Sequence, residues 1–249
     1  MINKIYIIES LRPSDELTGE KLYRNIIEKN ILSEQKEIEH NYVFTESKIE
    51  FLNELESILK NTKGEDEIII HIEAHGGNEE MQFGNYELIK WTELETYLIK
   101  INSACKNKLH LNLATCHGMH IAEKISLKKT APYKSYTSAL RELLPSEILE
   151  DNSIFYQEII KTQDIFISYL EFCKQRPKTQ LRIKDLETGM KMILGLQISM
   201  FVKSPSILKD FFDHFLNIEI DNVKLNELNT ENEIVEYVLN LFLSRYLPK

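Results

Sequence analysis

Short apolar runs alternate with longer amphipathic stretches over the first 144 residues. Runs rich in the residue types typical of strands cover residues 4–9, 38–44, 67–73, 109–114 and 133–140. Between them apolar residues recur at helical spacing, and helices are expected over residues 18–32, 45–59, 92–101 and 119–127. This alternation predicts an α/β protein with a mostly parallel central sheet between two layers of helices.

The run 67–73 is the most apolar of these segments. It has four isoleucines in seven residues, as expected of a central strand that is buried on both faces. The segment 81–88 after it predicts a small hairpin around Gly84-Asn85.

The pattern changes after Leu144, where no further strand is expected. Helices are predicted over residues 155–174, 185–202, 206–216 and 230–246. Thr230 and Glu233 form a capping box at the start of the last one. We therefore expect a first domain over residues 1–176 and a helical C-terminal region over residues 177–249, packed on or beside it.

Composition and charge narrow the class of protein. The net charge is −9, and lysine and arginine are interleaved with glutamate, which argues against binding to nucleic acid. No run reaches the roughly 18 apolar residues of a membrane span, and the first nine residues become charged too soon for a signal peptide. The three cysteines have irregular spacing, which suits a reducing compartment. We expect a cytoplasmic protein without membrane association.

Two reactive residues follow the two most apolar strand runs. His75 lies two residues beyond the run 67–73, and Cys116 lies two residues beyond the run 109–114. In open parallel sheets, binding and active sites lie beyond the carboxyl ends of the strands. If these two strands are neighbours, the side chains meet at one edge, as a thiol nucleophile and its base require.

The residues around this pair suit the same chemistry. A free thiol with a pKa of about 8.5 needs a nearby imidazole, and the amides of a helix starting just after Gly118 would favour the thiolate. Gly76 and Gly77 let the backbone turn beside the base. The amides of Gly76 and Cys116 are candidates for an oxyanion hole.

The same residue types also have structural interpretations. His71 and His75 are four apart on a strand, about 13 Å at about 3.3 Å per residue, which is too far for one zinc. Other candidate ligands for a structural zinc are Cys105, His110, Cys116, His117 and His120. No Cys-x-x-Cys pair anchors them, so we expect no metal and no cofactor. Cys105 and Cys173, on helical stretches, are interpreted as core residues.

The order apolar strand, His-Gly, about 40 residues, apolar strand, small residue-Cys-x-Gly resembles the caspase-like cysteine peptidases. The resemblance covers about residues 1–175 and implies a caspase–hemoglobinase fold. It assigns His75 as general base and acid, Cys116 as nucleophile, and the amides of Gly76 and Cys116 as the oxyanion hole.

Other segments refine this resemblance. Residues 114–118 lack the Gln before and the Arg after the cysteine of caspases, so cleavage after aspartate is not implied. The short chain and the hairpin after His75 look more like bacterial caspase-like and CHAT peptidases. Residues 5–10 and 18–23 resemble defence proteases that cleave gasdermins or similar effectors.

In that family the loop after the first strand helps to form the primary specificity pocket. Here it contains Arg12, which would favour an acidic substrate residue, and Asp15, which would favour a basic one. The alternative is that both charges are merely solvated. Tyr136, Thr137 and Ser138, at the end of the fifth strand, would form the other wall.

The C-terminal helices leave two interpretations open. Their apolar stripe consists of Met190, Met192, Ile193, Leu196, Met200 and Phe201. It is interpreted as core, and the alternative is a Met-rich surface that docks an activating partner. An inactive caspase-like interaction module is the alternative function for the whole chain.

Overall fold

The computed structural model describes residues 1–139, 141–201, 204–216 and 230–249, together with 218, 221, 224, 225, 227 and 228. They form two compact units: Met1–Ile125 with Pro132–Lys184, and Ser126–Ala131 with Asp185–Lys249. The first unit thus extends to Lys184, beyond the expected division after residue 176. The expected strand 133–140 and helix 185–202 each end on a residue outside the described part, Leu140 and Val202.

A sheet with the strand order β2-β1-β3-β6-β7-β8 forms the middle of the first unit. These strands are β1 (Lys4–Ser10), β2 (Glu39–Phe44), β3 (Ile68–Gly76), β6 (Leu109–Ala114), β7 (Ser135–Ala139) and β8 (Leu181–Asp185). The pairs β1/β2, β1/β3, β3/β6 and β6/β7 are parallel. The expectation of a mostly parallel sheet is confirmed. So is the hairpin, as the antiparallel pair β4 (Glu80–Gln82) and β5 (Leu88–Lys90).

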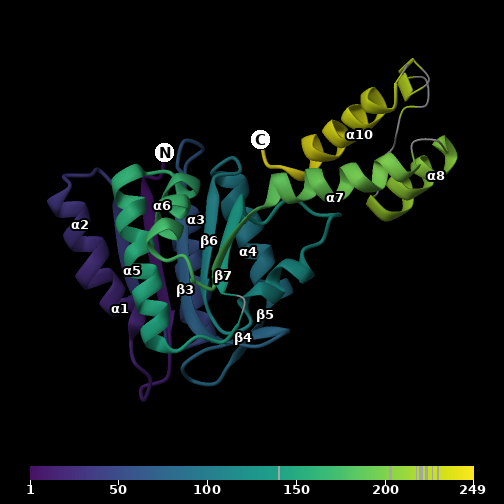
Figure 1. Cartoon of the computed structure of the whole chain (residues 1–249). Coiled ribbons are helices and arrows are strands. Elements are labelled where there is room, and N and C mark those ends of the chain that lie inside the picture. Colours follow the sequence, from purple (N-terminus) through teal and green to yellow (C-terminus); the bar gives the residue numbers. More distant parts are fainter. Residues whose placement is uncertain are drawn as a thin grey trace. The chain divides into compact units, whose positions relative to one another are not determined.

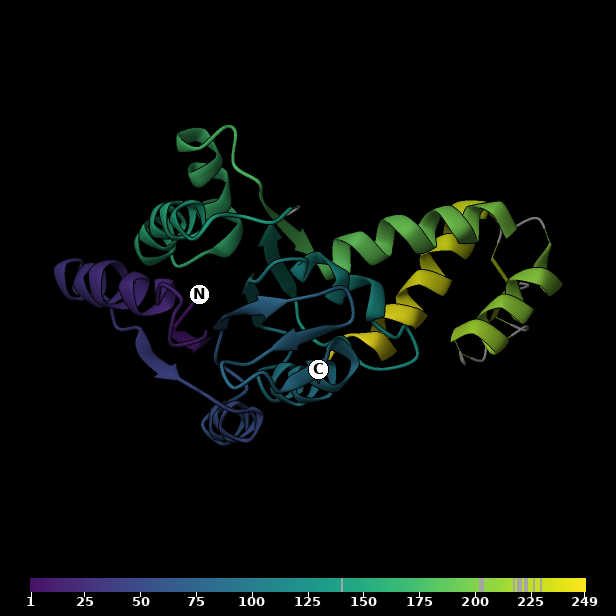
Figure 2. The same cartoon turned by 90° about the horizontal axis from the view of Figure 1, so that it is seen from below.

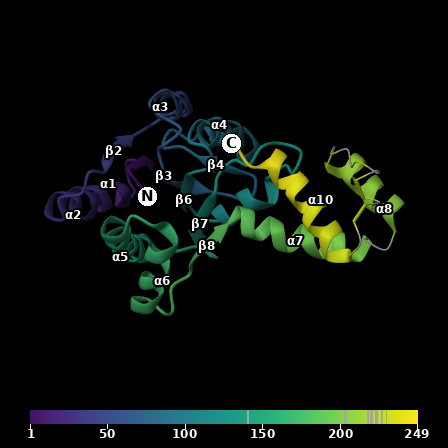
Figure 3. The same cartoon turned by 90° about the horizontal axis from the view of Figure 1, so that it is seen from above.

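Helices cover both faces of this sheet, which gives three layers (Figure 1). On one face lie α3 (Lys48–Lys60) and α4 (Trp91–Ala104); views from below and from above separate them clearly from the others (Figure 2, Figure 3). On the other face lie α1 (Thr18–Leu22), η1 (Tyr23–Ile27), α2 (Glu28–Ser33), α5 (Pro145–Thr162) and α6 (Ile165–Gln175). On this second face, Ile5 and Ile7 of β1 and Ile69 of β3 share a core with Phe155 and Ile159 of α5.

Three local predictions were wrong. The expected helix 155–174 is two helices, because Gln163 takes a left-handed backbone conformation with φ 52° and Asp164 then caps α6. The helix expected over 119–127 is a 3₁₀ segment, η2 (Gly118–Lys124). Strand β8 was not predicted, although Leu181 and Ile183 alternate with basic residues there.

The second unit is helical, with α7 (Leu186–Phe201), α8 (Pro205–Asp210), η3 (Phe211–Leu216) and α10 (Glu231–Tyr246). The capping box between Thr230 and Glu233 is confirmed. The interpretation of the α7 stripe as core is wrong for most of it. Among the described side chains of α7, Leu186, Leu194 and Ile198 are buried, whereas the exposed fractions of Met192, Ile193, Leu196 and Met200 are 66%, 53%, 69% and 76%. The side chain of Phe201 lies outside the described part. None of the described helices has the length and apolarity needed to cross a membrane.

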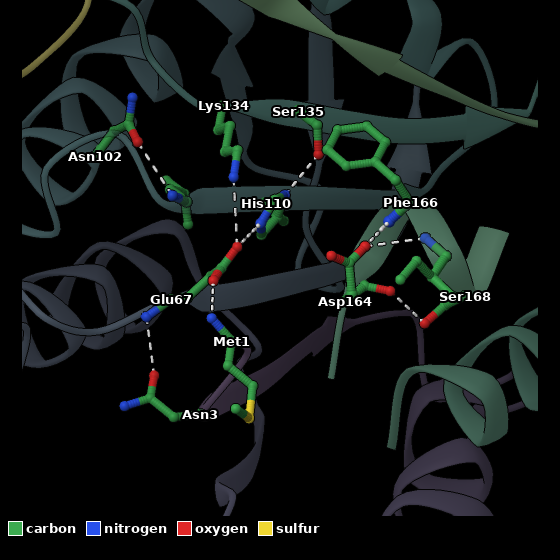
Figure 4. Close-up of polar contacts among 12 residues, drawn as sticks. Met1, Asn3, Glu67, Asn102, His110, Lys134, Ser135, Asp164, Phe166 and Ser168 are labelled. Carbon is green, nitrogen blue, oxygen red and sulfur yellow. Dashed lines mark hydrogen bonds and ion pairs between the residues drawn. The ribbon is translucent and has the colours of Figure 1, made fainter. Parts of the chain in front are cut away.

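Glu67, just before β3, contacts residues of several segments at the edge of the sheet where the parallel strands begin (Figure 4). Its carboxylate accepts a hydrogen bond from His110 Nε2 at 3.1 Å and pairs with Lys134 at 3.5 Å and with the amino group of Met1. Burial alone would raise the pKa of Glu67, but these partners hold it well below the usual range. Glu67 is therefore an ionised anchor at the edge where the parallel strands begin, opposite the edge that bears His75 and Cys116.

Candidate active site

His75 and Cys116 occupy equivalent positions near the carboxyl ends of two neighbouring strands. Cys116 lies two residues beyond β6 as predicted, but β3 extends to Gly76 and therefore contains His75. In the parallel pair β3/β6, Glu73 lies opposite Ala114, and each candidate follows two residues later. The prediction that their strands are neighbours is confirmed. On the other side of β3, Ser10 of β1 lies opposite Ala74, which brings the loop after β1 to the same edge.

Gly76 fits directly against Cys116. A Cβ added to Gly76 would lie 2.1 Å from the carbonyl oxygen of Cys116 and 3.0 Å from Cβ of Thr115. Real Cβ atoms do not approach backbone so closely, so only glycine fits here without a shift of the main chain. The backbone that bears the candidate base therefore packs against the backbone that bears the candidate nucleophile.

The hairpin after His75 holds that segment in place. His75 pairs with Gln82 in the antiparallel ladder between β3 and β4. The amide of Gly77 donates to the carbonyl of Glu80 at 2.8 Å, and Trp91 Nε1 donates to the carbonyl of Gly77 at 3.1 Å. The amide of Gly77 therefore already has a hydrogen-bond partner within the turn.

Gly118 has a similar role on the other segment. A Cβ there would lie 2.7 Å from both Ser138 Oγ and Thr115 Oγ1, and His117 before it adopts a left-handed conformation with φ 58°. The chain thus leaves Cys116 through a tight turn and not through the first turn of an α-helix.

His75 and Cys116 both line one cavity of about 230 Å³. The other residues around it are Leu11, Asp15, Glu16, Thr18, Glu73, Ala74, Ala114, Leu143, Pro145 and Ile148. Most of these side chains are apolar, and three are carboxylates. No lysine or arginine is among the described residues that line it.

Asp15 binds His75 directly. Its Oδ2 lies 2.7 Å from His75 Nε2 and also accepts the backbone N–H of Arg12 at 3.0 Å. The hydrogen bond from His75 is the largest influence on the pKa of Asp15, which is held below its usual value. Asp15 was expected to contact substrate; it lines the cavity, but its carboxylate contacts the candidate base.

The thiol of Cys116 is not pre-ionised. Burial, followed by the negative charge of Glu142, raises the pKa of Cys116 above its ordinary value, and the nearby amides of Leu143 and Cys116 only partly oppose this. The short 3₁₀ segment η2 stands where an α-helix was expected to stabilise the thiolate. At neutral pH the thiol therefore keeps its proton and needs a base to remove it.

The other expected substrate contacts lie elsewhere. Arg12 does not line the cavity: its Nη2 donates to Gln82 at 2.6 Å, and its guanidinium stacks over the ring of Tyr86 at 5.0 Å. Tyr136, Thr137 and Ser138 are buried within β7 and do not line the cavity either. Their assignment as one wall of a specificity pocket stays a prediction.

A buried acidic network, which reaches the cavity through Glu73, was not predicted from the sequence. Glu73 accepts hydrogen bonds from His71 Nε2 at 2.9 Å and from the hydroxyl of Thr18. Glu9, on the neighbouring strand, accepts the amide of Gly19 at 2.8 Å and the hydroxyl of Tyr42 at 2.8 Å. Burial, reinforced by the charge of Glu73, raises the pKa of Glu9 to about 7. The only sequence signal was the carboxylate near the end of each of two apolar strands.

The candidate zinc ligands have other partners. Within the described part of the chain, no three His, Cys, Asp or Glu side chains form a group that could hold a metal ion. Both ring nitrogens of His110 have partners, Ser135 at 2.7 Å and Glu67 at 3.1 Å. His117 pairs with Glu142 at 3.0 Å. Burial raises the pKa of Cys105 to about 11, which leaves that thiol unreactive.

Comparison with known proteins adds no relative: no family model matches the chain, and the search of curated proteins finds no significant match.

Proposed function

We propose that the chain is a cytoplasmic caspase-like cysteine endopeptidase that cleaves a protein substrate with His75 and Cys116. What supports the proposal most is the shared cavity: base and thiol line the same 230 Å³ space, at equivalent positions near the carboxyl ends of two adjacent parallel strands. The caspase-like pattern of the two loops in the sequence adds to it.

The proposed reaction has two stages. His75 takes the thiol proton of Cys116 as the sulfur attacks the carbonyl carbon of the peptide bond. The amides of Gly76 and Cys116 stabilise the resulting oxyanion. The imidazolium then protonates the leaving amine, and a thioester forms. Water, deprotonated by His75, attacks the thioester and releases the acid product and the thiol.

The cavity suits a basic or apolar substrate side chain better than an acidic one. Asp15, Glu16 and Glu73 line it, and a buried carboxylate on the substrate would be repelled there. This preference agrees with the sequence around Cys116, which lacks the Gln and the Arg that flank the cysteine of caspases. By resemblance, the proposed setting is bacterial defence, with a gasdermin-like effector as an example of a substrate.

A cleavage profile of the purified full-length chain tests this function. The chain is incubated with a library of peptides from denatured proteins, and new termini are read by mass spectrometry. We expect cleavage that is lost in Cys116→Ala and in His75→Ala but retained in Cys173→Ala. Cleavage by a folded Cys116→Ala variant would overturn the proposal.

An inactive interaction module is the second candidate function. The exposed apolar residues of α7 favour it, since such a surface suits a binding partner. In an active protease the same surface would receive an activating partner. A peptide-based acylating probe separates the two functions, since a working enzyme is modified at Cys116 before Cys105 or Cys173, whereas an inactive module shows no such preference.

A further inference from the structure

The turn that presents Asp15 is held by its own hydrogen bonds. The amide of Asp15 donates to the carbonyl of Arg12 at 2.9 Å, with Pro13 at the second position of the turn, where proline is favoured. In return, the carboxylate of Asp15 accepts the amide of Arg12 at 3.0 Å. The position of the carboxylate is therefore fixed within the turn, independently of its contact with His75.

The same turn is tied to the strand pair that contains His75. Arg12 Nη2 donates to the side chain of Gln82 at 2.6 Å, and Gln82 is the residue that lies opposite His75 in the β3/β4 ladder. The turn that bears Asp15 and the strand that bears His75 are thus both attached to Gln82. Within this framework Asp15 Oδ2 and His75 Nε2 lie 2.7 Å apart.

The neighbouring carboxylate does not share this role. Glu16 also lines the cavity, but its carboxylate pairs with the exposed Lys21 at 2.7 Å. Of the two consecutive acids, only Asp15 contacts the imidazole.

This contact decides which ring nitrogen is available. An ionised carboxylate only accepts hydrogen bonds, so the proton of a neutral imidazole must lie on Nε2. Nδ1 then has the lone pair, and no described residue forms a hydrogen bond with it. When Nδ1 accepts a proton, the positive ring lies beside a negative carboxylate, which stabilises it.

We propose that Asp15 is a positioning residue that holds His75 with its proton on Nε2, so that Nδ1 is the nitrogen that receives the proton of Cys116. It rests on the proposed function, because Asp15 acts through the proposed base. The proton passes from sulfur to Nδ1 during attack and from Nδ1 to the leaving amine afterwards, while Nε2 keeps its proton throughout.

The tautomer can be observed directly, without a substrate. Nitrogen-15 NMR of the full chain with labelled histidine, assigned by the loss of one signal set in His75→Ala, distinguishes protonation at Nε2 from protonation at Nδ1. We expect the neutral ring of His75 to be protonated at Nε2, and to become a mixture in Asp15→Asn. A neutral ring protonated at Nδ1 in the wild-type chain would overturn the inference.

Alkylation of Cys116 tests the consequence. The rate with iodoacetamide is measured against pH, by mass spectrometry of the peptide that contains Cys116. We expect Asp15→Asn to lower the rate near neutral pH at least about tenfold and to move the profile upward by about one pH unit. Glu142→Gln is the matched control, because Glu142 raises the pKa of Cys116; its removal should move the profile downward.

The outcomes distinguish the two proposals. If His75→Ala slows alkylation but a folded Asp15→Asn does not, the dyad stands and the role of Asp15 fails. If His75→Ala has no effect, the proposed function fails. An equal downward shift of the profile in Asp15→Asn and Glu142→Gln would reduce Asp15 to a general charge effect and would also contradict the inference.

Discussion

Gly76 and Cys116 are in such close contact that a single methyl group at residue 76 would reach within 2.1 Å of the carbonyl oxygen of Cys116. The contact joins two segments that are about 40 residues apart in the sequence. The contact fixes the distance between the backbone segments of the candidate base and the candidate nucleophile. It can be disrupted by a substitution at residue 76 that leaves both side chains, His75 and Cys116, unchanged.

Gly76→Ala should therefore separate the two segments. We expect a loss of about 2 kcal/mol in the free energy of unfolding, because the backbone must shift to admit the methyl group, and a loss of reactivity at Cys116. Gly77→Ala is the matched control, since a Cβ there would meet its nearest neighbour at an ordinary 3.6 Å. Urea unfolding and alkylation of Cys116 measure both effects; equal behaviour of the two variants would contradict the close contact.

Glu67 should stabilise the fold through its ionised form. Its folded pKa is depressed by His110, Lys134 and the amino group of Met1, so its contribution is present above the ordinary value of 4.5 and is lost as the pH falls below it. Glu67→Gln should cost about 2 kcal/mol near neutral pH and reduce the loss of stability on acidification. Glu65→Gln, which changes an exposed neighbour, should leave the unfolding midpoint almost unchanged.

Glu9 should have the opposite pH dependence. Its folded pKa of about 7 lies above the ordinary value of 4.5, so the folded state binds more protons and stability falls as the pH rises between these values. The full effect is on the order of 3 kcal/mol. Glu9→Gln should flatten this part of the stability profile, measured by urea unfolding. Glu37→Gln, at an exposed site, should retain the slope, and a slope that persists in Glu9→Gln would assign it to another group.

Substrate preference should reflect the carboxylates of the cavity. In a peptide library, we expect bonds preceded by aspartate or glutamate to be cleaved at least about tenfold more slowly than bonds preceded by a basic or apolar residue. Glu73→Gln should narrow this difference, because it removes a buried charge from the lining. Preferred cleavage after aspartate would show that the cavity is not the pocket for that residue.

Much of the sheet could be predicted because its strands are local patterns. The run 109–114 coincides with β6. Its pairing with β3 could be expected because both runs are apolar and each leads to a candidate catalytic residue, His75 or Cys116. Strand β8 was missed because it is short and only Leu181 is fully buried. The break between α5 and α6 depends on one left-handed residue, Gln163, which apolar spacing does not reveal.

The role of Asp15 is an example of information that lies outside local sequence. Recognising it requires that β1 lies next to β3, with Ser10 opposite Ala74, so that the turn after β1 reaches the base. Glu9 and Glu73 lie opposite each other in the β1/β3 pair for the same reason. Residue types and spacing identified His75 and Cys116 as candidates, but only the strand order places the acids around them.

The rate at which a peptidyl acyloxymethyl ketone labels Cys116, compared between the wild-type chain and a folded His75→Ala variant near neutral pH, tests the proposed dyad most directly. Because the pKa of Cys116 is raised by burial, the unassisted thiol should react slowly. We predict labelling at least about 100-fold faster in the wild-type chain. Equal rates in the two proteins would contradict the assignment of His75 as the base of Cys116.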